Sequence, residues 1–230
     1  MNKQIQKSID TSVNPLKEGT KLRSTASKFQ QRVVEASIDP LMLPDRIVLA
    51  LDCSGSMCGD KIESLKRAVV NFVRQCSPTK TALGLLTFGR STEDAVPLTT
   101  TYQIIEAVVN TASAQGGTPL YGCIDRIIRT SPVTRVVLVS DGCPTDRGSE
   151  HSIVTSYKES GIPIDCVHIG DDSSGEDVLR WISTETGGIF LKFTDIHALT
   201  TGLSYLTPGL RGLLQSGTVD SKTIGAKEIK

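Results

Sequence analysis

The stretch Ile47-Val48-Leu49-Ala50-Leu51-Asp52-Cys53-Ser54-Gly55-Ser56 decides the fold. Its apolar run predicts a buried strand that ends at a carboxylate. Asp52, Ser54 and Ser56 then follow at alternate positions, so in an extended loop their side chains lie on one side. Gly55 allows the backbone to bend around whatever these side chains hold. One carboxylate and two hydroxyls are hard oxygen ligands, which suit a small hard cation such as Mg²⁺.

Length and charge limit the class of protein. At 230 residues the chain can bury one substantial core, and we expect one domain with extensions. Its 25 basic and 25 acidic residues cancel, unlike the basic footprint of a nucleic-acid-binding protein. The longest apolar runs are too short to cross a membrane, and the first residues lack the apolar core of a secretory signal. We therefore expect a cytoplasmic protein with neither a nucleic-acid nor a membrane partner.

Apolar periodicity along the rest of the chain predicts strands that alternate with helices. Beyond the first strand, strands are expected over residues 81–88, 95–99, 135–140, 164–169 and 188–193. Helices are expected over residues 60–75, 102–113, 120–129, 150–160, 176–185 and 195–206. Near-continuous apolar strands in this order are typical of a parallel sheet covered by helices on both faces. We therefore predict a doubly wound α/β fold with a six-stranded, mostly parallel sheet and one antiparallel edge strand.

The two ends of the chain differ in composition from this middle part. Residues 1–45 are polar and Lys-rich at first, with one expected helix at about 25–37. This N-terminal extension is either a partly ordered tail or an arm that packs on the domain or on a partner. The domain itself is expected to span residues 46–206. Residues 207–230 form a polar, apolar-poor tail that we expect to be flexible.

Two more segments bring polar residues to the edge where the first strand ends. The apolar strand 135–140 ends in Asp141, as the first strand ends in Asp52. Carboxyl ends of parallel strands share one edge, and ligands of such sheets bind there. Thr118 opens a helix from the same side, after the paired glycines Gly116-Gly117 that predict unusual backbone angles or a close approach. The three segments are therefore expected to meet.

Together these segments resemble the von Willebrand factor A domain. Asp52-x-Ser54-x-Ser56, Thr118 in a Gly-Gly-Thr-Pro-Leu loop and Asp141 in a Ser-Asp-Gly turn match all five positions of that family's metal-ion-dependent adhesion site. The resemblance covers the expected domain and implies a Rossmann-like fold. It also implies Mg²⁺, with Mn²⁺ or Ca²⁺ as substitutes. Ser54 and Ser56 would bind the ion directly, and Thr118, Asp52 and Asp141 directly or through water.

The resemblance implies a non-catalytic protein-binding module. Neutral hydroxyls leave the metal electron-poor, so an open coordination position attracts an Asp or Glu side chain of a partner. An intracellular adaptor fits best. Intracellular members of the family work beside AAA+ ATPases or in bacterial stress-response operons, which suggests such partners by analogy alone. The alternatives are a structural or adhesive component of a surface or virion, and a metal-dependent hydrolase.

Other candidate groups carry weaker signals. Asp146, in the turn after Asp141, either supports the metal site or a partner surface, or is an ordinary turn residue. His151, His168 and His197 are scattered, and we expect them to be structural or exposed rather than a general base beside the serines. The six cysteines are expected to be reduced. Three of them lie in loops that could meet and hold a functional thiol cluster: Cys53, Cys58 and Cys143.

Overall fold

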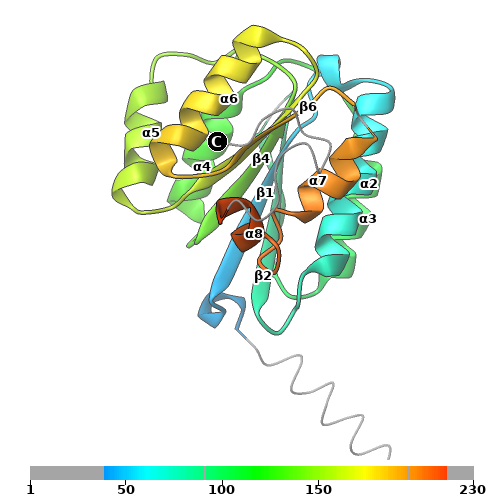
Figure 1. The fold of residues 1–230 in the computed structure, drawn as a ribbon, viewed down its shortest axis with the longest axis vertical. Coiled ribbons are helices and arrows are strands. Elements are labelled where there is room, and N and C mark those ends of the chain that lie inside the picture. The colour runs from blue at the N-terminus through cyan, green and yellow to red at the C-terminus, as the bar shows by residue number, and fades with distance from the viewer. Residues whose placement is uncertain (1–38, 91, 196, 217–230) are drawn as a thin grey trace, which may run out of the picture. The chain divides into compact units, whose positions relative to one another are not determined.

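The centre of the domain is a six-stranded sheet with the strand order β3-β2-β1-β4-β5-β6. The computed structural model describes residues 39–90, 92–195 and 197–216 (Figure 1). The strands are β1 (Asp45–Asp52), β2 (Thr81–Phe88), β3 (Thr92–Thr99), β4 (Arg135–Ser140), β5 (Ile164–Ile169) and β6 (Phe190–Phe193). Neighbouring strands run parallel except β2 and β3, which are antiparallel. The predicted fold class is therefore confirmed.

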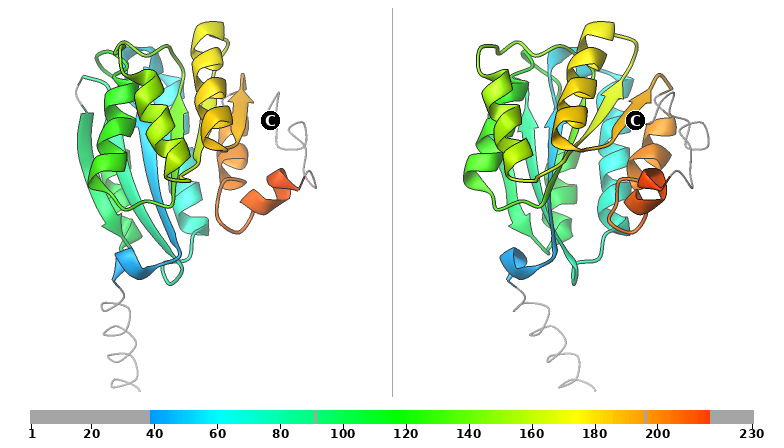
Figure 2. Two further views of the ribbon diagram at one scale, coloured as in Figure 1. Left: turned by 90° about the vertical axis from the view of Figure 1, so that its left-hand side faces the viewer. Right: turned by 60° about the vertical axis from the view of Figure 1, so that its left-hand side comes forward.

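Helices cover both faces of the sheet (Figures 1 and 2). One face carries α2 (Asp60–Gln75), α3 (Tyr102–Thr111) and α7 (Ala198–Ser204). The other carries α4 (Leu120–Thr130), α5 (Glu150–Glu159) and α6 (Ser173–Thr186). The remaining helical segments are short: η1 (Pro40–Met42), η2 (Gly55–Met57) and α8 (Arg211–Gln215).

The unbroken apolar run of β1 follows from its central place. Ile47, Leu49 and Leu51 point into the core beneath α2 and α7, whereas Val48 and Ala50 point into the core beneath α4. A strand buried on both faces has no position for a solvated side chain, so it lacks polar alternation. The chain passes from β1 outward to β3 and then returns to the other side of β1 as β4. This reversal places the carboxyl ends of β1 and β4 side by side, the usual ligand position in such sheets.

Helix α6 begins earlier than predicted because of a capping carboxylate. The expected start was residue 176, and the helix starts at Ser173. Asp172 accepts hydrogen bonds from the backbone N–H groups of Ser174 and Gly175. These bonds satisfy two N–H groups that have no partner inside the helix, which is the usual role of an N-terminal Asp. Helix α7 is shorter than predicted, since Asp195 instead forms a local turn with the backbone N–H of His197.

The structured part of the chain continues past residue 206, where the sequence placed the start of the tail. Helix α8 follows, and its Arg211 donates two hydrogen bonds to the buried carboxylate of Asp165 in β5, each of 2.8 Å. The predicted N-terminal helix and the last part of the tail, residues 217–230, lie outside the described residues. Among the residues described, no helix is both long and apolar enough to cross a membrane.

Candidate metal site

The carboxylate of Asp52 is fixed at the end of β1 by hydrogen bonds from two segments. Asp52 is completely buried. Its Oδ1 accepts the backbone N–H of Ser54 at 2.7 Å, and its Oδ2 accepts the hydroxyl of Ser140 from the neighbouring strand β4 at 2.5 Å. The short helix η2 then turns the chain immediately after Ser54. Asp52 therefore joins the two central strands and holds the start of the serine loop.

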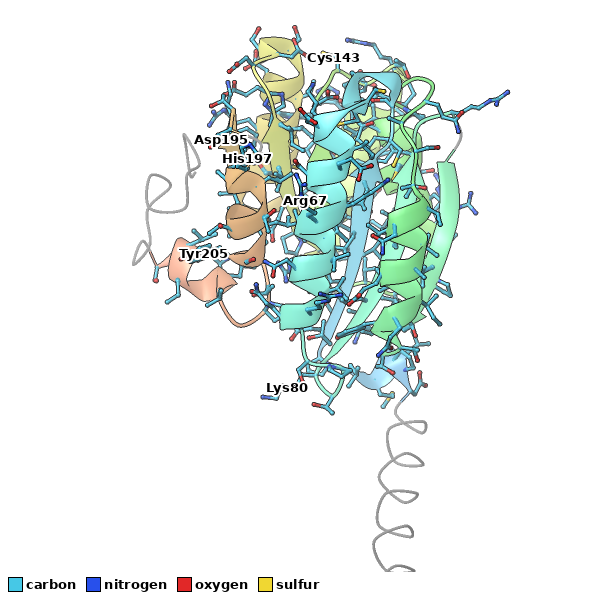
Figure 3. The ribbon with its side chains drawn as sticks, turned by 90° about the vertical axis from the view of Figure 1, so that its right-hand side faces the viewer. Arg67, Lys80, Cys143, Asp195, His197 and Tyr205 are labelled. Carbon is cyan, nitrogen blue, oxygen red and sulfur yellow. The ribbon has the colours of Figure 1, made fainter. Side chains whose placement is uncertain are left out.

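A chain of hydrogen bonds continues from the serine loop to the end of β4. The hydroxyl oxygens of Ser54 and Ser56 lie 3.0 Å apart. Ser56 donates its hydroxyl to Oδ1 of Asp141 at 2.7 Å, and Lys61 from the first turn of α2 forms an ion pair with Oδ2 of the same carboxylate. Figure 3 shows this edge of the sheet, marked by Cys143 just after Asp141, and the opposite edge, marked by Lys80 before β2. Four of the five predicted residues thus come together here.

Thr118, the fifth residue, reaches the same edge through its loop backbone. The carbonyl of Gly116 accepts the N–H of Gly55 at 3.0 Å. Gly116 has a φ of 82°, and a Cβ atom at this position would lie 2.5 Å from the Cα of Arg90. Gly116 thus has both predicted features, an unusual backbone angle and a close approach. Thr118 itself is buried, and its backbone is bonded to Thr145 on both sides.

The charge state of Asp52 depends on its burial and on its neighbours. Burial raises the pKa of Asp52, hydrogen bonds from Ser140 and Ser54 lower it, and the nearby charge of Asp141 raises it, with a net increase. A nearby cation would favour the ionised carboxylate and offset the cost of its burial. No three His, Cys, Asp or Glu side chains form a metal-binding group within the described part of the chain. A metal here would therefore depend on hydroxyl oxygens besides the two carboxylates, a donor set that fits Mg²⁺.

Asp146 has a role that sequence reasoning did not resolve. Its Oδ1 accepts the backbone N–H of Tyr121 at 3.2 Å, and its Oδ2 accepts that of Gly122 at 2.6 Å. Both N–H groups belong to the first turn of α4, which has no side-chain cap of its own. Asp146 therefore caps a helix that lies 24 residues earlier in the chain. Because local turn patterns report only near neighbours, the sequence offered no signal for this bond.

A cavity of about 610 Å³ lies beside the site and was not predicted either. It is bounded by the end of β2 and the end of α3, and residues next to the metal loops contribute to its wall, among them Cys53, Gly89, Arg90 and Gln115. Backbone hydrogen bonds join this wall to the site, since Cys53 donates to Phe88 O and accepts from Gln115 N. A molecule bound at this edge would therefore have a neighbouring recess with a cationic side chain, Arg90.

The cysteines and histidines near this edge have structural environments. All six cysteines are free thiols. Cys53 is buried, which raises the pKa of its thiol to about 11 and keeps it protonated at neutral pH. Cys58 is exposed and Cys143 is partly exposed. His168 is fully buried in β5, whereas His151 contacts the ring of Trp181 at a centroid distance of 5.0 Å.

Comparisons with known proteins agree with the fold. The profile of the von Willebrand factor type A domain matches residues 45–191. No curated protein sequence matches the chain. A solved structure of a von Willebrand factor type A protein from Catenulispora acidiphila has a TM-score of 0.64 and 20% identity, over 71% of this chain and 42% of that one. The chain thus spans less than half of that relative.

Two further solved structures show the same fold. The conserved hypothetical protein BatB from Bacteroides thetaiotaomicron has a TM-score of 0.59 and 17% identity, covering 70% of this chain and 95% of that one. The vWF domain of the type V pili tip protein Mfa5 from Porphyromonas gingivalis has a TM-score of 0.53 and 12% identity, covering 76% and 95%. Identities this low show likeness of fold alone. The matched profile spans more than half of the sequence, and the chain therefore belongs to the von Willebrand factor type A domain family.

Proposed function

We propose that this domain binds partner proteins through a Mg²⁺ ion held at the carboxyl edge of its sheet. The observation that carries the proposal is the hydrogen-bonded series from buried Asp52 through the serine loop to Asp141. The proposal is supported by two carboxylates and two hydroxyls at one edge of the sheet, and by the bond between the serine loop and the loop of Thr118. Mg²⁺ prefers oxygen ligands of this kind and keeps several waters. Mn²⁺ or Ca²⁺ could substitute for it.

Each of the five candidate residues would have its own role at the ion. Ser54 and Ser56 would contact the ion through their hydroxyls, while Asp52 would hold the serine loop and supply negative charge. Thr118 and Asp141 would act directly or through water. Because the hydroxyls carry no charge, the ion would keep enough positive character to attract a carboxylate from a partner. The partner group would therefore be an Asp or Glu side chain on a protein, and the domain would be a binding module rather than an enzyme.

We place this activity in an intracellular adaptor. The neutral charge balance gives no reason to expect nucleic acid as a partner. An AAA+ ATPase or a stress-response protein remains an analogy from the family. An adhesive or structural role would use the same metal and the same partner carboxylate in another compartment. Cell fractionation with an antibody against the chain separates these two settings.

The metal is tested by isothermal titration of the full chain with Mg²⁺. Wild type should bind one ion, and Asp52→Asn and Ser54→Ala should weaken the affinity by at least about tenfold, the effect typical of lost metal-site groups. Asp125→Asn is the matched control, because Asp125 pairs with Arg129 on the surface of α4. Equal Mg²⁺ affinity in all four proteins, or none in wild type, would rule the proposal out.

The partner chemistry is tested with the same proteins on a peptide array. Peptides that contain Asp or Glu should be retained in Mg²⁺ and released by a chelator, and their Asn or Gln counterparts should not be retained. Ser54→Ala should lose the acidic peptides, and Asp125→Asn should keep them. If the acidic peptides stay bound after the chelator is added, the partner does not bind through a metal.

A further inference from the structure

We propose that Thr145 and Asp146 are positioning residues that hold Thr118 at the metal edge. The inference rests on the proposed function, since it concerns how one of the metal-binding residues is placed. Thr118 lies in the connection between α3 and α4, and Thr145 and Asp146 lie in the connection between β4 and α5. The two connections are far apart in sequence, and side-chain and backbone bonds join them.

The first set of contacts joins Thr145 directly to Thr118. The backbone N–H of Thr118 donates to Oγ1 of Thr145 at 3.0 Å. In the opposite direction, the backbone N–H of Thr145 donates to the carbonyl of Thr118 at 2.9 Å. Thr118 is therefore bonded on both sides of its Cα atom by one residue. Such a pair fixes both the position of the backbone and the direction in which the side chain leaves it.

The second set of contacts fixes the helix that follows Thr118. Asp146 accepts the N–H groups of Tyr121 and Gly122, as described above. Pro119 is the residue at the N-terminal cap of α4 and makes no side-chain capping bond. A carboxylate is well suited to this place because the start of a helix carries partial positive charge. The backbone is thus held at Thr118 and again three residues later.

The side chains of Thr145 and Asp146 lie close to two glycines, Gly117 and Gly122. A Cβ atom at Gly117 would lie 3.0 Å from Oγ1 of Thr145, and one at Gly122 would lie 3.3 Å from Oδ2 of Asp146. Both distances are shorter than ordinary carbon–oxygen contacts. A larger residue at either position would therefore push the side chain of Thr145 or Asp146 by a few tenths of an ångström from its present contacts.

This arrangement couples two of the metal-binding residues. The segment 141–146 begins with Asp141 and ends with the residues that hold Thr118. A shift of this connection would therefore move Asp141 and Thr118 together. Residues that orient metal ligands typically change metal affinity by about ten- to a hundredfold when they are replaced. We expect an effect of this size when the hydroxyl of Thr145 is removed, because it holds the backbone of Thr118.

The experiment uses the full chain and Mn²⁺, whose free and bound forms differ in electron paramagnetic resonance. Thr145→Val keeps the shape of the side chain and removes the acceptor for Thr118, and we expect Mn²⁺ affinity to fall about tenfold or more. Thr145→Ser keeps the hydroxyl and should restore wild-type affinity. The matched control is Thr186→Val, because Thr186 accepts the backbone N–H of Ile164 at the opposite edge of the sheet. It should keep the Mn²⁺ affinity of wild type.

A second readout separates positioning from a general loss of stability. Where Thr118 binds the ion directly, its withdrawal opens a coordination position to water, so the water-proton relaxation caused by bound Mn²⁺ should rise in Thr145→Val and stay constant in Thr186→Val. Asp146→Asn, which keeps one acceptor oxygen, provides an independent variant with a smaller loss of affinity. Wild type without Mn²⁺ binding would overturn the proposed function as well. Wild-type binding that Thr145→Val and Asp146→Asn leave unchanged would overturn this inference alone.

Discussion

Lys61 and Asp141 form an ion pair across 80 residues of sequence, at the edge where the metal is proposed to bind. The carboxylate of Asp141 is almost fully buried, and the Lys61 side chain is 32% exposed. The ammonium group of Lys61 is thus paired with a carboxylate oxygen of Asp141 that could also bind a divalent cation. Lys61 and a bound metal ion would therefore compete for the same negative charge.

We predict that Lys61→Met raises the affinity for Mg²⁺. Removal of the ammonium frees one oxygen of Asp141 and removes a repulsion between like charges. A partly exposed pair is worth up to about 1 kcal/mol, which corresponds to an increase of about two- to fivefold. Isothermal titration at low and high salt measures the Mg²⁺ affinity of Lys61→Met and of wild type. The increase in affinity should be smaller in high salt because exposed charges are screened.

Lys66→Met is the control for this measurement. Lys66 lies on the next turn of the same helix and pairs with Glu63 instead. Its replacement removes an equal charge from α2 without freeing Asp141. If Lys61→Met and Lys66→Met raise the Mg²⁺ affinity equally, the increase is caused by the lower overall charge of α2. A lower affinity in Lys61→Met would show that Lys61 assists the metal.

The bond between Ser140 and Asp52 gives a second prediction, on stability. Ser140→Ala leaves Oδ2 of Asp52 without its 2.5 Å donor, and a hydrogen bond to a charged group is worth about 1.5–3 kcal/mol. The free energy of unfolding in urea at pH 7 should fall by that amount. Ser183→Ala is the comparison, since the buried Ser183 hydroxyl donates to the neutral carbonyl of Arg180 in its own helix.

Loss of the same bond should also change the pH dependence of metal binding. The hydrogen bond from Ser140 lowers the pKa of Asp52 against the larger effect of burial. Without it the pKa rises further, so the carboxylate is ionised only at higher pH. The midpoint of Mg²⁺ binding against pH should therefore move upward in Ser140→Ala. A midpoint that stays in place would mean that Asp52 does not set the charge at the site.

A third prediction concerns the opposite edge of the sheet, where Arg135, Asp165 and Arg211 form a buried ion network. Asp165 accepts hydrogen bonds from both guanidinium groups and from the backbone N–H of Ile189. Asp165→Asn removes the negative charge and leaves two buried cations without a counter-charge. Breaking a buried pair in this way costs about 3–5 kcal/mol, which urea denaturation at pH 7 would measure. Glu106→Gln, at the exposed pair with Arg74, should cost less than about 1 kcal/mol.

The same contacts determine how the contribution of Asp165 to stability changes with pH. Burial raises the pKa of Asp165, but the bonds and charges of Arg211 and Arg135 outweigh burial and lower it below the ordinary value of 3.8. The unfolded chain then binds the proton first as the pH falls. The contribution of Asp165 is complete above about pH 4 and declines at lower pH. The difference between wild type and Asp165→Asn should therefore narrow below pH 4, and a constant difference would contradict the network.

These contacts show which parts of the structure the sequence predicts. The apolar run of β1 and the helical spacing of α2 report burial directly, so their places and the mostly parallel sheet could be predicted. The five candidate residues could be chosen from the sequence because each follows a strand or opens a helix, and their role as ligands stays a prediction. Arg211 and Asp165 are 46 residues apart, and Asp146 and Gly122 are 24 apart. Neither pair has a periodic pattern, and both depend on the final packing.

His168 gives the last prediction, since it is a buried imidazole in β5 opposite Ser140 of β4. Neither ring nitrogen has a hydrogen-bond partner among the described residues. Burial lowers the pKa of His168 below 6.5, and Lys192 lowers it too, whereas Glu176, Asp172 and Asp141 oppose this effect. The folded protein therefore binds the proton less readily than the unfolded chain does.

Stability should consequently fall as the pH drops below about 6.5 and continue to fall until the folded pKa is reached. Urea denaturation at pH 7.5 and 5.5, values chosen around the ordinary histidine pKa of about 6.5, should show this loss in wild type. His168→Leu should show a smaller loss, because leucine fills the site and binds no proton. His197→Gln should keep the wild-type loss, since His197 is exposed. If His168→Leu loses as much stability as wild type, then groups other than this imidazole take up the proton on unfolding.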